Sequence, residues 1–386
     1  MKNFQRVSTF VSTDIAGCLA TINPTKVTAA LILSGALPLL SFAQTPTLSN
    51  LTVSAVLDGY YQSEDRLMTE RAKGFGLGET ELAFSASIDD MFFGKLTTVF
   101  ESHEGETEVN VEEAFIQTMA LPNGFTVRAG RFLSDIGYLN NQHLHTDAFT
   151  SRPSAYRAFL GGHYFDDGLR VSYIAPTDLY WTMGAEVFSG DSLRAEDESG
   201  EREFDSTGVY TAFTKIGGDI GIESSWQLGA SYLRNENGLL TPEEHDEEGE
   251  EAHAHSASYT GKNTFVADFV YKWAPNGNYK YQHLTLSAEY FRVSDFMVPD
   301  LDEEHLSAEH DEEGSVNDYH QAWYVSGVYQ FSPSWSAGLR YGKLNTQVLH
   351  EEHFDQQTLK ETELSVAWHN SHFSTVRVEF SHQSNI

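Results

Sequence analysis

Residues 265–273, Phe-Val-Ala-Asp-Phe-Val-Tyr-Lys-Trp, carry the pattern that decides the fold. Phe265 and Phe269 would share one face of an extended strand, because successive side chains of a strand point to opposite sides. Asp268 and Lys272 would lie on the other face. Large apolar residues thus alternate with small or charged ones over about ten residues, the length that a tilted strand needs to cross a bilayer.

The same alternation recurs along the chain, for example in residues 286–290 and 335–341. Turn-forming sequences separate the alternating runs, and they stand at residues 89–90, 121–124, 175–178, 217–219, 275–278, 332–334 and 370–372. Long polar segments lie between these short turns, which is typical of outer-membrane barrels. We therefore predict an all-β, transmembrane antiparallel β-barrel. A soluble β-sandwich is disfavoured because its strands are shorter and its connections do not alternate in length.

We find about fifteen strands between Leu51 and Phe380. Bacterial single-chain barrels have an even number of strands, so we predict a complete barrel of about 16 strands. We therefore expect the last strand to be missing from this chain, and a miscount by one hairpin is the alternative. The barrel is expected to span residues 44–386 without a second domain, because the first strand follows residue 44 too closely to leave room for a plug.

Residues 1–43 are predicted to be a signal peptide with an over-long start. Lys26 precedes an apolar run at 29–37, and Ser41-Phe42-Ala43 resembles a small-residue cleavage site. Residues 15–18 imitate a lipoprotein box, but polar residues interrupt the apolar run before it. The chain has one cysteine, Cys18, so the exported protein would contain no disulfide.

The charge balance is strongly acidic. Asp and Glu number 56 against 24 Lys and Arg, which gives a formal net charge of -32. This balance disfavours nucleic acid and anionic ligands and favours cations through long-range attraction.

The longest connection low in charge follows the fifth strand and covers residues 134–166. It is too apolar and too long for an ordinary surface loop. We expect it to fold into the lumen, with apolar residues on the inner wall and charged residues facing the channel. An ordinary ordered outer loop is the alternative.

The motifs 129–132 (Ala-Gly-Arg-Phe), 137–143 and 156–162 resemble a His-rich group of outer-membrane proteins often labelled zinc-regulated or TonB-dependent-receptor-like. More broadly, the chain is similar to sixteen-stranded porins, whose third outer loop folds inward to form a constriction. The porin resemblance implies trimers and passive flow through a polar pore. The absent plug domain conflicts with the receptor label.

Within the porin comparison, negative charge in the pore would come from Glu112, Glu113 and Asp135. The opposing basic wall would consist of Arg128, Arg131, Arg152 and Arg157. Such opposed charges orient dipolar solutes at a constriction. The alternative is that these arginines pair with carboxylates and hold the loop in place. His143 and His145 would place a pair of metal ligands at the same constriction.

Three outer loops, 236–261, 295–318 and 346–357, combine histidine with many acidic residues. Imidazole and carboxylate together suit divalent ions such as zinc. The candidate metal ligands are His245, His253, His255, His305, His310, His350 and His353. Flexible loops would bind zinc or calcium weakly, and no cofactor is required. A generic acidic surface that bridges lipopolysaccharide is the alternative.

We predict a porin-like diffusion channel of the Gram-negative outer membrane, cation-leaning, that assists the uptake of divalent metal such as zinc. The alternatives are a general porin for small polar solutes and a plugless receptor or adhesion barrel. The expected partners are outer-membrane lipid, lipopolysaccharide, small cations or polar solutes, and two further copies in a homotrimer. No enzyme is expected, because no spacing singles out a nucleophile with its base.

Overall fold

The computed structural model describes residues 51–69, 71–103, 106–194, 206–237, 262–294, 319–350, 353–371 and 373–385, and the backbone of residues 8–14. Strands make up most of the described chain. The strands are β1 (Ser8–Asp14), β2 (Thr52–Gln62), β3 (Gly74–Leu77), β4 (Thr80–Ser87), β5 (Phe92–His103), β6 (Glu106–Thr118), β7 (Phe125–Leu133), β8 (Phe165–Ile174), β9 (Tyr180–Phe188), β10 (Val209–Ile220), β11 (Ser224–Asn235), β12 (Asn263–Trp273), β13 (His283–Ser294), β14 (Tyr319–Ser332), β15 (Trp335–His350), β16 (His353–Ser371) and β17 (Ser374–Asn385).

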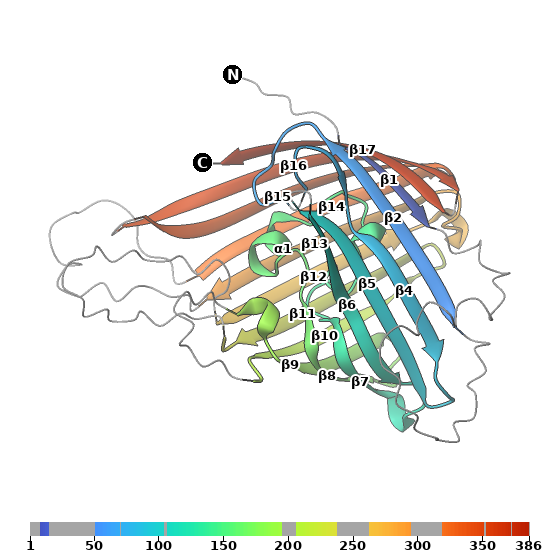
Figure 1. The fold of residues 1–386 in the computed structure, drawn as a ribbon. Helices are drawn as coiled ribbons and strands as arrows, with labels where there is room; N and C mark the ends of the chain where they lie inside the picture. Colours follow the sequence, from blue (N-terminus) through green and yellow to red (C-terminus); the bar gives the residue numbers. More distant parts are fainter. Residues whose placement is uncertain are drawn as a thin grey trace, which may run out of the picture.

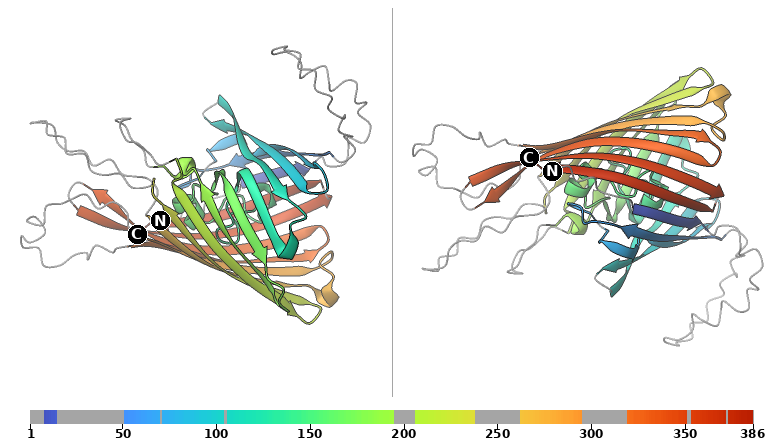
Figure 2. Two further views of the ribbon diagram at one scale, coloured as in Figure 1. Left: turned by 90° about the horizontal axis from the view of Figure 1, so that it is seen from below. Right: turned by 90° about the horizontal axis from the view of Figure 1, so that it is seen from above.

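Neighbours along the chain pair antiparallel, from β2 with β4 through to β16 with β17. The short strand β3 pairs with residues 59–62 of β2. Within the described residues, β2 and β4–β17 thus form one continuous series of fifteen strands, which confirms the all-β fold and the strand count. Figures 1 and 2 show this series as a tilted sheet wrapped around a space that contains the short helix α1 (Ser154–Phe159).

The seam between β17 and β2 differs from the prediction of a vacant position. The strand β1 pairs antiparallel with residues 374–379 of β17 and with residues 56–61 of β2. It is therefore the sixteenth strand of the described sheet. Because β1 has 7 residues and its neighbours have 11 and 12, it covers only part of this seam.

Connections alternate in length as expected, with two corrections. The turn predicted at 217–219 lies inside β10, and the chain reverses at 221–223, where Gly221 has a φ of 65°. Residues 346–357 were expected to form a loop, but β15 and β16 continue through this region until His350 pairs with His353. Backbone pairing can continue beyond the bilayer, so a polar composition does not show where the two strands of a hairpin end.

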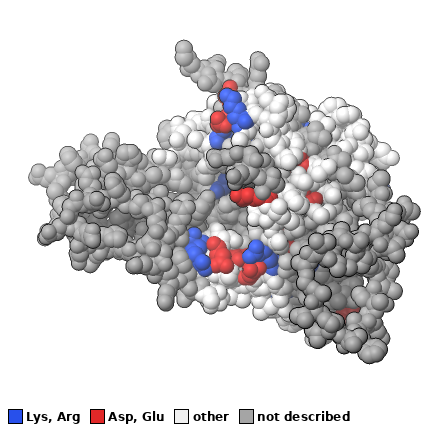
Figure 3. Space-filling view, viewed as in Figure 1, with Lys and Arg blue, Asp and Glu red and all other residues white. Residues whose placement is uncertain are grey.

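The two faces of the sheet differ in polarity. Phe265 and Phe269 are exposed on the outward face of β12, whereas Asp268 between them is 3% exposed and points inward. Other exposed apolar residues on the strands are Leu57, Leu96, Ile116, Leu169, Val171, Trp181, Leu228, Leu286, Tyr290, Val325, Leu339, Leu364, Trp368 and Phe380. Figure 3 shows charged side chains gathered in separate patches at the top and in the middle of this face, with a broad uncharged surface to their right. Apolar outside and polar inside is the arrangement of an integral outer-membrane β-barrel.

One region of the interior is apolar. Phe291 and Val293 of β13 are buried, and they join a cluster that includes Tyr156 and Phe159 of α1 and Phe132 of β7. The alternation of β13 continues, but its inward residues become apolar because the loop that contains α1 packs on them. None of the described helices is long and apolar enough to span a membrane.

Candidate functional site

The connection between β7 and β8, residues 134–164, contacts the opposite side of the sheet. The hydroxyl of Tyr156 donates a hydrogen bond of 2.9 Å to Oε1 of Glu289 on β13. Thr150 donates through its hydroxyl to Oε1 of Glu379 on β17, over 2.9 Å. Both carboxylates belong to buried, inward-facing residues. The loop therefore crosses the space enclosed by the strands.

Buried arginines hold this loop in place. Arg152 is fully buried, and its two terminal nitrogens donate hydrogen bonds of 2.5 Å to the carbonyl oxygens of Leu139 and Gln142. Its Nε lies 2.9 Å from Oδ2 of Asp147. Arg152 therefore joins three parts of the loop and does not form an exposed basic wall, which corrects one prediction in favour of its alternative.

Arg157 has a similar role at the far wall. Its Nη2 lies 2.5 Å from Oε2 of Glu361 on β16, and its Nη1 donates to the carbonyl of Leu67 in the connection between β2 and β3. Arg66 of that connection also reaches Glu361 and Glu363, over 2.8 Å in each case. Two inward-folded connections are thus fastened to the same carboxylate, that of Glu361.

The sequence reasoning missed Arg66 and these carboxylates. The two glutamates on β16 stand at alternate positions, 361 and 363, so their common face could have been recognised from the sequence. Which distant arginines meet them depends on loop paths that periodicity does not encode.

Arg131 was expected to face the pore, and this prediction is wrong. Its side chain forms an ion pair of 2.9 Å with Asp167, and the two side chains are 34% and 57% exposed. Asp167 lies on the outward face of β8, which it shares with exposed Leu169 and Val171. Arg131 lies opposite Asp167 on β7, so it belongs to the same outward face.

Arg128 and Asp135 line a polar cavity of about 340 Å³ beside the loop. Asp135 pairs with Lys215 of β10 over 2.5 Å. Arg128 donates two hydrogen bonds, of 2.9 and 2.7 Å, to Oε1 of Gln117. Lys215 and Arg170 also line this cavity but were not predicted. Lys215 and Arg170 each stand in a strand between alternating apolar residues. Only the path of the loop shows that both line the same cavity.

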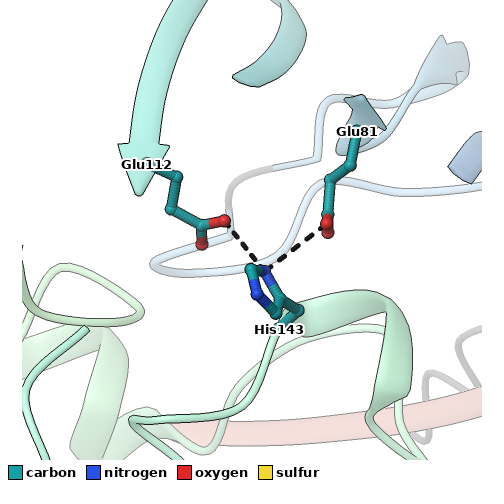
Figure 4. Close-up of side chains that lie close together, drawn as sticks. All are labelled: Glu81, Glu112 and His143. Atoms are coloured by element: carbon teal, nitrogen blue, oxygen red, sulfur yellow. Dashed lines mark ion pairs between the residues drawn. The ribbon is translucent and has the colours of Figure 1, made fainter. Parts of the chain in front are cut away.

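A second polar cluster surrounds His143. Its Nδ1 lies 2.9 Å from Oε2 of Glu112 and 3.4 Å from Oε2 of Glu81, as Figure 4 shows. Its Nε2 lies 3.0 Å from Oε2 of Glu113, which also contacts Lys95. The structure thus brings together three residues of the predicted constriction.

Two further histidines of the loop extend this cluster. Nδ1 of His145 lies 2.6 Å from Oε1 of Glu81, and Nε2 of His163 lies 2.9 Å from Oε1 of Glu112. His145 was predicted to be near the constriction, whereas His163 and Glu81 were not. No local spacing relates these residues, because His145 and His163 lie 18 positions apart in the loop and Glu81 belongs to β4.

A bulge in β6 turns two consecutive carboxylates inward. Thr97 of β5 pairs with Glu113, and the next residue, Thr98, pairs with Val111, so Glu112 has no partner in the register. In a regular strand one of the two glutamates would face outward. Because a bulge adds one residue, both are instead buried, with exposures of 2% and 4%.

The carboxylates around His143 control its protonation. Burial alone would lower the pKa of this imidazole, but its contacts with Glu112 and Glu113 raise the pKa to about 10. The cluster therefore attracts positive charge strongly.

His245, His253, His255, His305 and His310 lie outside the described residues. His350 and His353 pair in the backbone register where β15 meets β16, and their side chains are outside the described part.

Comparisons with known proteins give distant likenesses. No family model matches the chain. An uncharacterised protein of Aquifex aeolicus (strain VF5) is 28% identical over 311 residues, which cover 78% of this chain and 61% of that relative. The chain thus spans less than two thirds of the relative's length.

Similar solved structures are outer-membrane proteins. The outer membrane channel DcaP of Acinetobacter baumannii has a TM-score of 0.46 and 11% identity, over 99% of this chain and 96% of that one. OmpF of Salmonella typhi, in complex with daunomycin, has a TM-score of 0.40 and 10% identity, over 98% of each chain.

Proposed function

We propose that the chain is a diffusion channel for small polar or charged solutes and that it prefers cations. The observation that carries the channel is the polar cavity of about 340 Å³ beside the inward-folded loop. Its charged lining is Asp135 with Arg128, Arg170 and Lys215, so the preference for cations rests on the interior as a whole and not on this cavity. An apolar outward face with polar groups around an internal cavity is the arrangement that passive outer-membrane channels use.

The interior carries more carboxylates than basic groups. The buried acidic residues are Asp58, Glu81, Glu112, Glu113, Asp147, Asp166, Glu186, Asp268, Glu289, Glu361, Glu363 and Glu379. The buried basic residues are Arg152, Arg157, Arg170, Lys215, Arg340 and Arg377. Adding the half-buried Arg66, Arg71, Lys95 and Arg128 leaves the carboxylates in excess. An acidic interior in a chain of net charge -32 favours cations over anions.

Single-channel recording in planar bilayers tests this proposal with a matched pair of variants. The full chain should conduct steadily and show a reversal potential of cation selectivity in a potassium chloride gradient. Arg128→Gln removes a positive charge from the cavity wall and should increase cation selectivity. Arg131→Gln removes the same charge from the outward face and should leave selectivity unchanged. Absence of current, or equal effects of both variants, would reject the proposal.

The finer proposal is that the outer loops 236–261 and 295–318 concentrate divalent metal such as zinc at the channel mouth. Their support is composition, since histidine recurs among acidic residues in separate loops. Micromolar zinc should alter the current of the wild type. Replacement of His245, His253, His255, His305 and His310 by alanine should reduce this effect.

Other outcomes distinguish the alternative functions. A steady current indifferent to zinc favours a general porin for small polar solutes. A folded protein without conductance favours a receptor or adhesion barrel. A homotrimer in lipid that contains lipopolysaccharide is part of the proposal, and cross-linking in native outer membranes tests it.

A further inference from the structure

We propose that Glu81, Glu112 and His143 form a binding site for a divalent metal ion of the zinc class inside the barrel. This inference rests on the proposed channel, because it places the ion in its lumen. One potential ligand atom from each residue lies within 4.8 Å of the other two. Its residues are different from the candidate ligands of the outer loops.

The distances are compatible with a shared ion. Zinc binds imidazole nitrogen and carboxylate oxygen at about 2.0–2.2 Å, so tetrahedral ligand atoms are roughly 3.4 Å apart. Nδ1 of His143 lies 3.4 Å from Oε2 of Glu81 and 2.9 Å from Oε2 of Glu112. Small side-chain rotations would therefore suffice to place an ion between them.

Hydrogen bonding does not account for the closest of these contacts. Neither carboxylate oxygen of Glu112 has a hydrogen-bond partner of good geometry among the described residues, and the same holds for Nδ1 of His143. Glu112 is 2% exposed, so water access to its carboxylate is small. Buried polar atoms that converge without hydrogen bonds require another partner, and a metal ion would supply it.

The charges point to a divalent ion. Within the part of the chain that the structure describes, no lysine or arginine forms an ion pair with Glu81 or Glu112, which are 4% and 2% exposed. Glu113 differs, because Lys95 contacts it. One divalent ion would compensate the two remaining buried carboxylates, and it would displace the proton from the His143 imidazole that contacts both of them.

Two neighbouring histidines contact the two glutamates of the proposed site. His145 contacts Glu81 and His163 contacts Glu112, over 2.6 and 2.9 Å. The histidines belong to the inward-folded loop, and the glutamates belong to the wall. A bound ion would therefore fasten the loop to β4 and β6. The three imidazoles retain 12–22% exposure, which leaves a route for an ion from solvent.

The bulge in β6 is independent support. It leaves Glu112 without a register partner and turns this residue inward beside Glu113. Bulges are enriched next to functional sites, where they redirect a side chain. Here the redirected side chain is a proposed ligand.

Titration with Co²⁺ in detergent micelles tests the site, because bound Co²⁺ gives visible absorption bands that report its ligands. The other candidate ligands, His245, His253, His255, His305, His310, His350 and His353, are first replaced by alanine to remove competing sites. On this background the folded chain should bind about one Co²⁺ ion, and Zn²⁺ should displace it.

Three variants on the same background assign the ligands. Glu112→Gln keeps the side-chain shape, and His143→Ala removes the imidazole, so each should weaken Co²⁺ binding by at least about tenfold. His283→Ala removes a histidine at the first position of β13, where its Nδ1 lies 2.9 Å from the carbonyl oxygen of Tyr279, and should not change binding. Electrophoresis of heated and unheated samples verifies that each variant is folded.

Two results would overturn the site: no Co²⁺ bands on the background chain, or equal affinity in Glu112→Gln and the background. The first result means that protonated imidazoles alone compensate the carboxylates. These results are independent of the channel proposal. A chain that conducts as predicted but binds no Co²⁺ rejects the metal site alone, whereas a chain that binds Co²⁺ without conductance rejects the channel.

Discussion

Arg152 shows how one buried side chain can hold a long loop. It donates to two carbonyl oxygens and pairs with Asp147, and it is 0% exposed. Arg152→Ala should reduce the free energy of unfolding by about 3–5 kcal/mol, because it leaves a buried carboxylate without its partner. Unfolding by urea in micelles, followed by tryptophan fluorescence, measures this change.

The control is the exposed pair of Arg194 and Asp191, whose side chains are 37% and 53% exposed. Arg194→Ala should cost less than about 1 kcal/mol, because exposed ion pairs contribute little. Similar losses for both variants would mean that burial of Arg152 does not determine its contribution.

The ion pair of Asp135 and Lys215 should make the free energy of unfolding depend on pH. Burial alone would raise the pKa of this carboxyl, but attraction to Lys215 and Arg170 holds the pKa below its usual value. A depressed pKa means that the pair stabilises the folded state above the unfolded pKa, about 3.9, and loses this contribution as the pH falls through the folded value.

The comparison with Asp135→Asn isolates this contribution. The difference in unfolding free energy between wild type and variant should be constant from pH 7 to pH 5 and should shrink below about pH 4. A difference that changes near neutral pH would contradict the assignment of the pair.

Strand alternation predicted which residues of β12 face inward, because the period of a strand is fixed by its backbone. It could not predict the bulge at Glu112, since one extra residue leaves the composition of the strand unchanged. It also misassigned Arg131, whose charge alone placed it in the pore. Glu112 and Glu113 were predicted with His143 at the constriction, whereas Glu81 and His163 escaped prediction because β4, β6 and the two parts of the loop meet only through long-range pairing.

The bulge in β6 can be removed by the deletion of a single residue. Deleting Glu112 would pair Thr98 with Val111 and Thr97 with Glu113 without an extra residue. Every remaining side chain keeps its face, so the barrel should fold with little loss of stability. The deletion should abolish Co²⁺ binding, which absorption titration measures.

Deletion of Val111 is the matched control. It also removes the bulge, but it moves Glu112 to the outward position where Val111 is 38% exposed. A charged residue on the lipid-facing side destabilises a barrel. This variant should be less stable than the deletion of Glu112, and equal stability would contradict the proposed register.

The seam between β2 and β17 determines whether the strands close into a barrel. The two strands run in the same direction, because β1 is antiparallel to both. A strand between them must therefore run the other way, as the odd count of fifteen already required. Barrel strands in a bilayer need paired edges, since unpaired backbone groups are costly there. The sequence predicted this gap, but it did not predict that residues 8–14 would pair with its edges.

Two properties of residues 8–14 are in conflict. They pair with both edges of the seam, yet they belong to the predicted signal peptide, residues 1–43. Seven residues are also fewer than the roughly 9–11 that a transmembrane strand uses. We therefore predict that export removes this segment and that protein extracted from outer membranes begins near Gln44. Intact-mass measurement with N-terminal sequencing decides the matter, because a chain that retains Met1 would make β1 the strand that joins β17 to β2.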